Sequence, residues 1–161
     1  MTDTSFSRGV ILFFRLAIGW TFLYAGVTQL IDPNFTVAGF LGATKTFHSL
    51  FEWFASPEMA PVTNILVPWG HLLIGLALVS GFVVRVSGVF GILLLITYYF
   101  AHMDFPYVEG KVNFVMDYHL VYVAALALVM YVRGGEVFGL DGWLKRQTFV
   151  QNHPGLKPLL G

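Results

Sequence analysis

The chain has no cysteine among its 161 residues. Disulfide bonds, thiol redox chemistry and thiolate metal sites are therefore excluded. Charged residues are also scarce, at 11% of the chain, against roughly 25% in soluble domains. The formal net charge is zero, so nothing in the charge balance favours nucleic acid as a partner. Apolar residues make up 57% of the chain, more than one domain of this length can cover in water.

Four apolar runs predict transmembrane helices, because about 20 apolar residues at 1.5 Å each cross a bilayer core. The run from Asn64 to Gly88 contains no Asp, Glu, Lys or Arg before Arg85, and His71 lies inside it. Gly81 is a plausible end for one helix, followed by a tight turn into the next. We expect spans at about 10–30, 64–81, 85–102 and 115–133. The predicted fold is a single all-α domain over residues 1–161, an integral membrane four-helix bundle.

The connection between the first two spans, residues 31–63, carries apolar side chains at helical spacing. Five of them would share one face of a helix: Phe40, Phe47, Leu50, Phe51 and Phe54. This pattern predicts one short amphipathic helix in the membrane interface, which Pro57 and Pro61 would end before the second span. The helix would serve either as structural cover over the bundle or as a lid over a site.

Lysine and arginine are divided unevenly between the predicted loops. One side, with both termini and the 81–88 turn, holds Arg8, Arg15, Arg85, Arg133, Lys145, Arg146 and Lys157. The other side holds Lys45 and Lys111. By the positive-inside rule, both termini are expected in the cytoplasm. We accordingly expect a multi-pass protein of a bacterial or archaeal cytoplasmic membrane.

That orientation places the polar side chains of the spans in the outer half of the membrane. Counted at ~1.5 Å per residue from the inner boundaries, His71 lies ~15 Å up, His119 ~21 Å and His102 ~25 Å. An ionisable residue inside a span is a candidate for function by default. We expect His71, Tyr98 and His119 to line one cavity, with Asp117 towards its mouth and His102 above it.

Two interpretations of these side chains stay open. A quinone needs an apolar cleft with one or two hydrogen-bond donors, which His71, His119, Tyr98 and Tyr122 could supply, and a histidine could also pass a proton. Alternatively, the same groups only join neighbouring helices by hydrogen bonds. A metal ion is not expected, because the histidine heights spread over ~10 Å. A haem is not expected either, since His71 and His119 differ in depth by about a turn.

Arg15 lies in the first span on a face of small and polar residues: Arg15, Gly19, Phe22, Gly26 and Gln29. This composition is typical of a face packed against other helices. A lone charge ~9 Å into a span would be costly. We therefore predict an ion pair with a carboxylate at the cytoplasmic end, with Asp141 as the first choice and Glu136 as the second. The alternative is that Arg15 extends to the near interface.

Four stretches together carry a resemblance to a known family. They are R-x₃-G-x₆-G in the first span, WGHLLIGLALVSGFVVR, DYHLVYVAALAL, and GLD at 139–141. The chain resembles the DoxX/DoxD family of small four-helix membrane proteins. Its long first connection is more similar to the DoxD branch, which includes the small subunit of thiosulfate:quinone oxidoreductase. Members of the family often carry Glu where this chain has His71.

The resemblance implies a membrane subunit beside a redox partner, with a quinone as its expected ligand and no covalently bound cofactor. The chain would be at most one subunit of a quinone-linked oxidoreductase. The alternative is a non-catalytic accessory subunit packed against a larger respiratory or photosynthetic complex. In either case we expect contact with the lipid bilayer and with another protein subunit.

Overall fold

The structure, a computed structural model, describes residues 4–109 and 113–161, and most of these residues are helical. Within them, three helices are long and apolar enough to cross a membrane. They are α1 (Thr4–Ile31), α4 (Ala60–Ser80) and α5 (Val84–Ala101). A shorter apolar helix, α6 (Tyr118–Tyr131), follows them.

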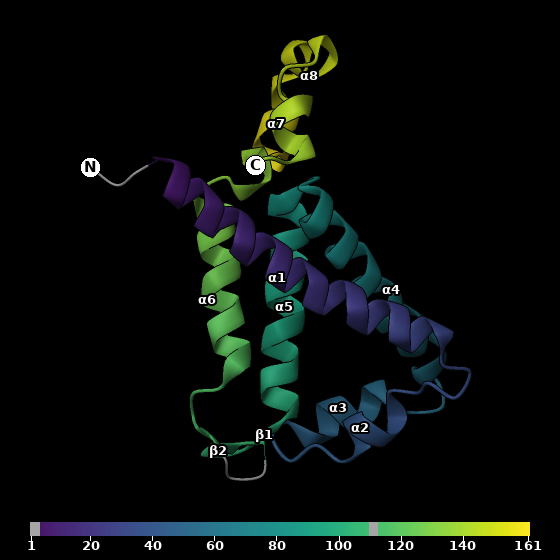
Figure 1. The fold of residues 1–161 in the computed structure, drawn as a ribbon. Coiled ribbons are helices and arrows are strands. Elements are labelled where there is room, and N and C mark those ends of the chain that lie inside the picture. The colour runs from purple at the N-terminus through teal and green to yellow at the C-terminus, as the bar shows by residue number, and fades with distance from the viewer. Residues whose placement is uncertain (1–3, 110–112) are drawn as a thin grey trace.

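The remaining elements lie at the two ends of these helices (Figure 1). At one end are α2 (Ala38–Gly42), α3 (His48–Phe54) and a small antiparallel sheet. Its strands pair in the order β1 (Met103–Asp104), β2 (Tyr107–Val108), β3 (Asn113–Phe114). At the other end are the 3₁₀ helix η1 (Gly134–Glu136), α7 (Leu140–Leu144), α8 (Thr148–Asn152) and η2 (Pro154–Leu159). Lys111, counted above for orientation, lies outside the described residues.

Three span boundaries differ from those expected. The helix α1 begins at Thr4, before the expected start near residue 10. The helix α4 begins at Ala60, because Pro61 lies in its first turn, where the missing N–H of a proline breaks no hydrogen bond. Pro61 therefore belongs to the start of the span and does not separate it from the preceding helix. The helix α6 begins at Tyr118, because the side chain of Asp117 caps it by accepting hydrogen bonds from the backbone N–H groups of His119 and Leu120.

The prediction of one amphipathic helix between the first two spans was wrong, because two helices form there. The chain leaves α2 at Gly42, and Phe47 then takes a left-handed conformation with φ 52° directly before α3. Phe40 therefore belongs to a different helix from Phe51. Phe51 is buried in a small core with Val37, Leu41 and Ala101, whereas Phe47 is exposed. The two helices together cover the end of α5.

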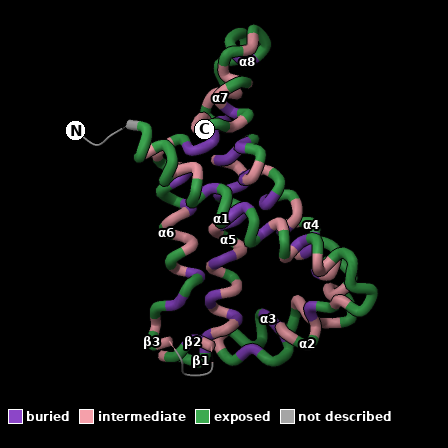
Figure 2. The backbone as a smooth tube through the Cα atoms, viewed as in Figure 1, coloured by how far each residue is buried: buried purple, intermediate pink, exposed green. Residues whose placement is uncertain are grey.

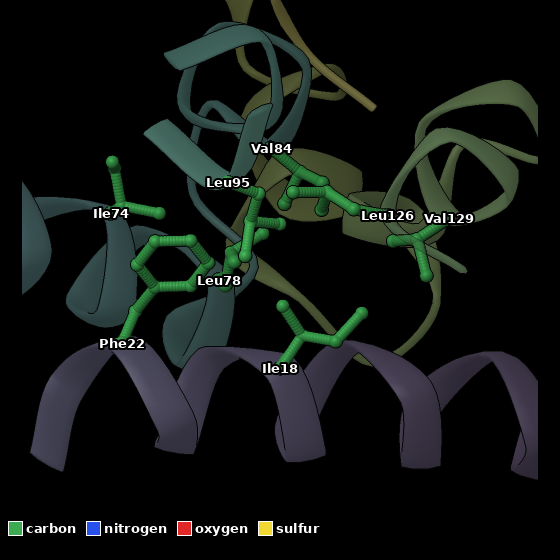
Figure 3. Packing of buried hydrophobic residues seen from close by; sticks show 8 residues of the cluster. All are labelled: Ile18, Phe22, Ile74, Leu78, Val84, Leu95, Leu126 and Val129. Carbon is green, nitrogen blue, oxygen red and sulfur yellow. The ribbon is translucent and has the colours of Figure 1, made fainter. Parts of the chain in front are cut away.

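The closest helix contact joins α1 and α4. A Cβ atom on Gly26 would overlap the backbone of Leu72, and one on Gly75 would overlap the backbone of Leu23. Small residues at such positions allow two membrane helices to pack backbone against backbone. The main apolar core lies alongside, formed by Ile18, Phe22, Ile74, Leu78, Val84, Leu95, Leu126 and Val129 (Figure 3).

The outward faces of the helices are apolar. Exposed positions run along each long helix (Figure 2), and large apolar side chains occupy many of them, including Phe13, Trp20, Leu66 and Phe90. An exposed apolar surface of this extent suits contact with lipid. The 28 residues of α1 span about 42 Å, which is longer than a hydrocarbon core of about 30 Å. The helix crosses α5 obliquely (Figure 1).

Candidate functional site

A cavity of about 380 Å³ lies where the end of α1, the start of α6 and the segment around α2 come together. It is lined by Gln29, Phe35, Thr36, Val37, Phe40, His71, Tyr98, His102, Tyr118 and His119. The volume lies within the range of small-molecule sites, which runs from about 300 to 1,000 Å³. The wall is made largely of flat aromatic and imidazole rings.

Tyr98 is the ring through which the three histidines are connected. The centroid of its ring lies 5.5 Å from that of His71, in a stacked arrangement, and 6.3 Å from those of His102 and His119. The rings of His102 and His119 are 5.1 Å apart. The heights of the three histidines were counted as if the helices were straight and parallel. They overstate the distance between His71 and His102, because α4 runs obliquely to α5 (Figure 1).

The three cavity histidines all use Nδ1 for a contact within the protein. His71 Nδ1 lies 2.9 Å from the carbonyl oxygen of Val67, and His102 Nδ1 lies 2.8 Å from that of Tyr98. Since a carbonyl oxygen can only accept, each Nδ1 carries the proton and donates it. In the neutral ring, Nε2 is then a free acceptor. Within the described residues, no protein group hydrogen-bonds to Nε2 of these histidines.

His119 has a different partner, the carboxylate of Asp117. Its Nδ1 lies 2.5 Å from Asp117 Oδ2, and both side chains are buried. The other oxygen, Oδ1, accepts the backbone N–H of His119 at 3.1 Å and that of Leu120 at 3.4 Å. One carboxylate therefore caps α6 and also orients the His119 ring. A carboxylate on Nδ1 fixes the tautomer and stabilises the ring when Nε2 gains a proton.

Two candidate residues do not line the cavity. Asp117 is not among the lining residues, and its carboxylate contacts Nδ1 of His119, which is one of them. Tyr122 packs against the main apolar core, with its ring 5.8 Å from that of Tyr118. Tyr118 itself lines the cavity and stacks on His119 at 4.1 Å. Its position directly after the Asp117 cap is the signal that could have identified it from the sequence.

Gln29 is a lining residue that was not among the candidates. Its Oε1 atom is buried and has no hydrogen-bond partner in the part of the chain that the structure describes. A buried acceptor of this kind is costly unless a ligand or water supplies a donor. Gln29 shares a helix face with Gly26, so the helical spacing on α1 could have placed it against α4.

Metal-binding histidines often have this same arrangement, with the second ring nitrogen held by a carbonyl or a carboxylate. Within residues 4–109 and 113–161, however, no three His, Asp or Glu side chains come close enough to hold an ion together.

Arg15 and Asp141 lie at the opposite end of the helices, both almost fully buried. Arg15 donates to three carbonyl oxygens, at 2.7 Å for Gly134 and Val137 and at 3.3 Å for Phe138. The structure forms no direct ion pair between Arg15 and Asp141 within 4.0 Å, both residues being among those described. The second choice, Glu136, pairs with Lys145 and Arg133 instead.

Asp141 holds three backbone N–H groups. Its oxygens accept from Val83 at 2.7 Å, Val84 at 3.0 Å and Gly161 at 2.8 Å. Arg15 and Asp141 therefore stabilise the same end of the molecule through the backbone rather than through each other.

In a comparison with known families, a DoxX family model matches residues 10–103, which is more than half of the chain. The chain belongs to the DoxX family. As a DoxX protein it is a membrane protein, in agreement with its apolar helices. His71, Tyr98 and His102 lie within the matched residues, whereas Tyr118 and His119 lie beyond them. No curated protein and no solved structure matches the chain.

Proposed function

We propose that this DoxX protein is a membrane subunit of a redox complex and that its cavity binds the head group of a quinone or quinol. The observation that carries the proposal is the ring of acceptors and aromatic side chains around a cavity of about 380 Å³. A flat quinone ring can stack against Tyr98 and the histidines. The hydroxyl groups of a quinol can donate to Nε2 atoms of the histidines or to Gln29 Oε1. The carbonyl oxygens of a quinone can accept from tyrosine hydroxyls.

The proposed chemistry is proton transfer to and from that ligand. A quinone that gains two electrons takes up two protons, and a quinol that loses two electrons releases them. His119 Nε2 is suited to carry one of these protons, because Asp117 is hydrogen-bonded to the other nitrogen and stabilises the charged ring. The electrons would come from, or go to, a partner subunit. The resemblance to the DoxD branch suggests a complex of the thiosulfate:quinone oxidoreductase type.

The proposal includes the topology of a single domain. In it, α1, α4, α5 and α6 cross the membrane as a four-helix bundle, with both termini in the cytoplasm of a bacterium or archaeon. Support comes from the Lys and Arg count and from the structure, in which Arg8 lies 4.8 Å from the ring of Phe138, near the C-terminal elements. The cavity would then lie in the outer half of the bilayer.

A binding experiment with matched histidine variants tests the ligand. The protein would be placed in lipid nanodiscs and titrated by calorimetry with a short-chain quinone and with its quinol. His71→Leu removes one wall of the cavity and one acceptor, and should weaken binding of the preferred form about tenfold or more. His153→Leu is the control, because His153 makes the same type of contact from Nδ1, at 2.8 Å from Phe149, but lies outside the cavity. Equal affinities for the two variants would contradict the proposal.

The accessory-subunit alternative has its own supporting observation. An apolar groove of about 660 Å³ runs between α4 and α5, lined by side chains such as Leu73, Ala77, Phe90 and Leu94. A helix of a larger complex could pack there. Under this alternative, His71→Leu would reduce assembly with partner subunits and leave quinone-dependent turnover per assembled complex unchanged. Under the quinone proposal, the same variant would assemble normally and lose turnover.

A further inference from the structure

A second pocket, of about 370 Å³, gathers positive charge at the α7 end of the molecule. Its lining consists of Arg85, Arg133, Lys145, Lys157 and Pro158. The four cations come from four different segments: Arg85 from the start of α5, Arg133 from directly before η1, Lys145 from directly after α7, and Lys157 from η2. Residues so far apart in sequence meet here because the C-terminal segment folds back against the start of α5.

The cations are only partly neutralised. Glu136 binds Lys145 at 2.5 Å and lies 3.9 Å from Arg133. Arg85 donates to the carbonyl oxygen of Pro158 at 3.5 Å, and Lys157 donates to the side-chain oxygen of Gln151 at 3.1 Å. Within the described residues, neither Arg85 nor Lys157 has a carboxylate within 4.0 Å.

The pocket has more positive than negative charge. Four cations line the pocket, and among the described residues Glu136 is the one carboxylate in an ion pair with any of them. Like charges held together at a half-buried site raise the energy of the folded state, and a bound anion would lower it.

The scaffold of this pocket is fixed by Asp141. Its buried carboxylate accepts the N–H groups of Val83 and Val84, directly before Arg85, and also the N–H of Gly161. The start of α5 and the C-terminal segment are thereby tied to one group. Pre-positioning of charged side chains reduces the entropy that binding costs.

We propose that this pocket binds a phosphate group, carried by an anionic lipid head group or by a soluble phosphate. Two arginines offer forked donors that match phosphate oxygens, and two lysines add compact charges. Basic pockets between helix ends are suited to anionic head groups. The inference goes beyond the proposed quinone site and is independent of it, because the two pockets share no residue.

The test measures retention of phosphatidylglycerol. Protein in nanodiscs of phosphatidylcholine with a minor fraction of phosphatidylglycerol would be released and examined by native mass spectrometry. The double variant Arg85→Gln/Lys157→Gln should retain phosphatidylglycerol about tenfold less than the unmodified protein. Arg8→Gln/Arg146→Gln is the matched control, because it removes the same charge near the same end but outside this pocket.

The two sources of phosphate are separated by competition. If inorganic phosphate displaces the lipid at millimolar concentration, the pocket recognises the phosphate group alone. If it does not, the rest of the lipid contributes, and both results support the proposal. The charge-conserving variant Arg85→Lys/Lys157→Arg should retain the lipid, which separates loss of charge from loss of structure. Equal retention by the pocket variant and the control would overturn the proposal, because it would show only diffuse attraction.

Discussion

Replacing Asp141 by alanine is expected to destabilise the protein strongly. The side chain is fully buried and accepts hydrogen bonds from Val83, Val84 and Gly161. Asp141→Ala leaves these three N–H groups without an acceptor. Each buried donor left unpaired costs about 1–3 kcal/mol, so the upper limit is about 9 kcal/mol.

Two effects reduce that figure. Removing a buried carboxylate recovers the free energy that its desolvation costs. Val83 is a β-branched residue held at φ 44°, and release of its N–H lets this strained turn relax by about 1–3 kcal/mol. We therefore expect a loss of about 3–5 kcal/mol in the free energy of unfolding. At about 2–4 °C per kcal/mol for a chain of this size, the midpoint of thermal unfolding should fall by about 10 °C.

The measurement is thermal unfolding in nanodiscs, followed by near-ultraviolet circular dichroism. Asp104→Ala is the control, because Asp104 is exposed and its side chain forms no hydrogen bond with the described residues. Asp141→Asn should fall between the two, since it keeps one acceptor oxygen and turns an NH₂ group towards a donor. A midpoint for Asp141→Ala within about 1 °C of the control would refute the reasoning and show that the three N–H groups find other partners.

Two further predictions concern packing and topology. Gly26→Ala should destabilise the fold by about 1–3 kcal/mol, because its Cβ would overlap the Leu72 backbone. In the same unfolding assay Gly9→Ala should be neutral, since nothing lies within 4 Å of a Cβ at that position. Because the chain has no cysteine, single cysteines can report sidedness: an impermeant thiol reagent should label Met116→Cys but not Phe6→Cys in intact cells. Labelling of Phe6→Cys from outside would refute the proposed orientation.

Sequence reasoning worked where one property of a segment decides its structure. A run without charges around His71 indicated a membrane helix, and the structure has α4 there. Gly81 ends that helix in a left-handed conformation, with φ 69°, as the pattern indicated. The motifs around Arg15 and His71 indicated the DoxX family, which the family comparison confirmed.

Sequence reasoning failed where the structure of a segment depends on its contacts with distant segments. Helical spacing joined Phe40 to Phe51, but nothing local revealed the left-handed turn at Phe47 that separates α2 from α3. A charge rule paired Arg15 with Asp141, whereas the folded backbone offers each of them several partners at a short distance. Which nitrogen of His119 faces the cavity also depends on Asp117 and on the start of α6, and these are properties of the folded chain.

The short length of α6 has a consequence for the surrounding lipid. Its 14 residues span about 21 Å, against about 30 Å for a hydrocarbon core. If α6 crosses the membrane as proposed, the mismatch of about 9 Å must be met by thinning of the bilayer beside it. Head groups would then dip towards Tyr118 and the sheet next to it. For an amphiphile in the outer leaflet, the shortest lateral path into the protein would then lie on this side, at the level of the His119 ring.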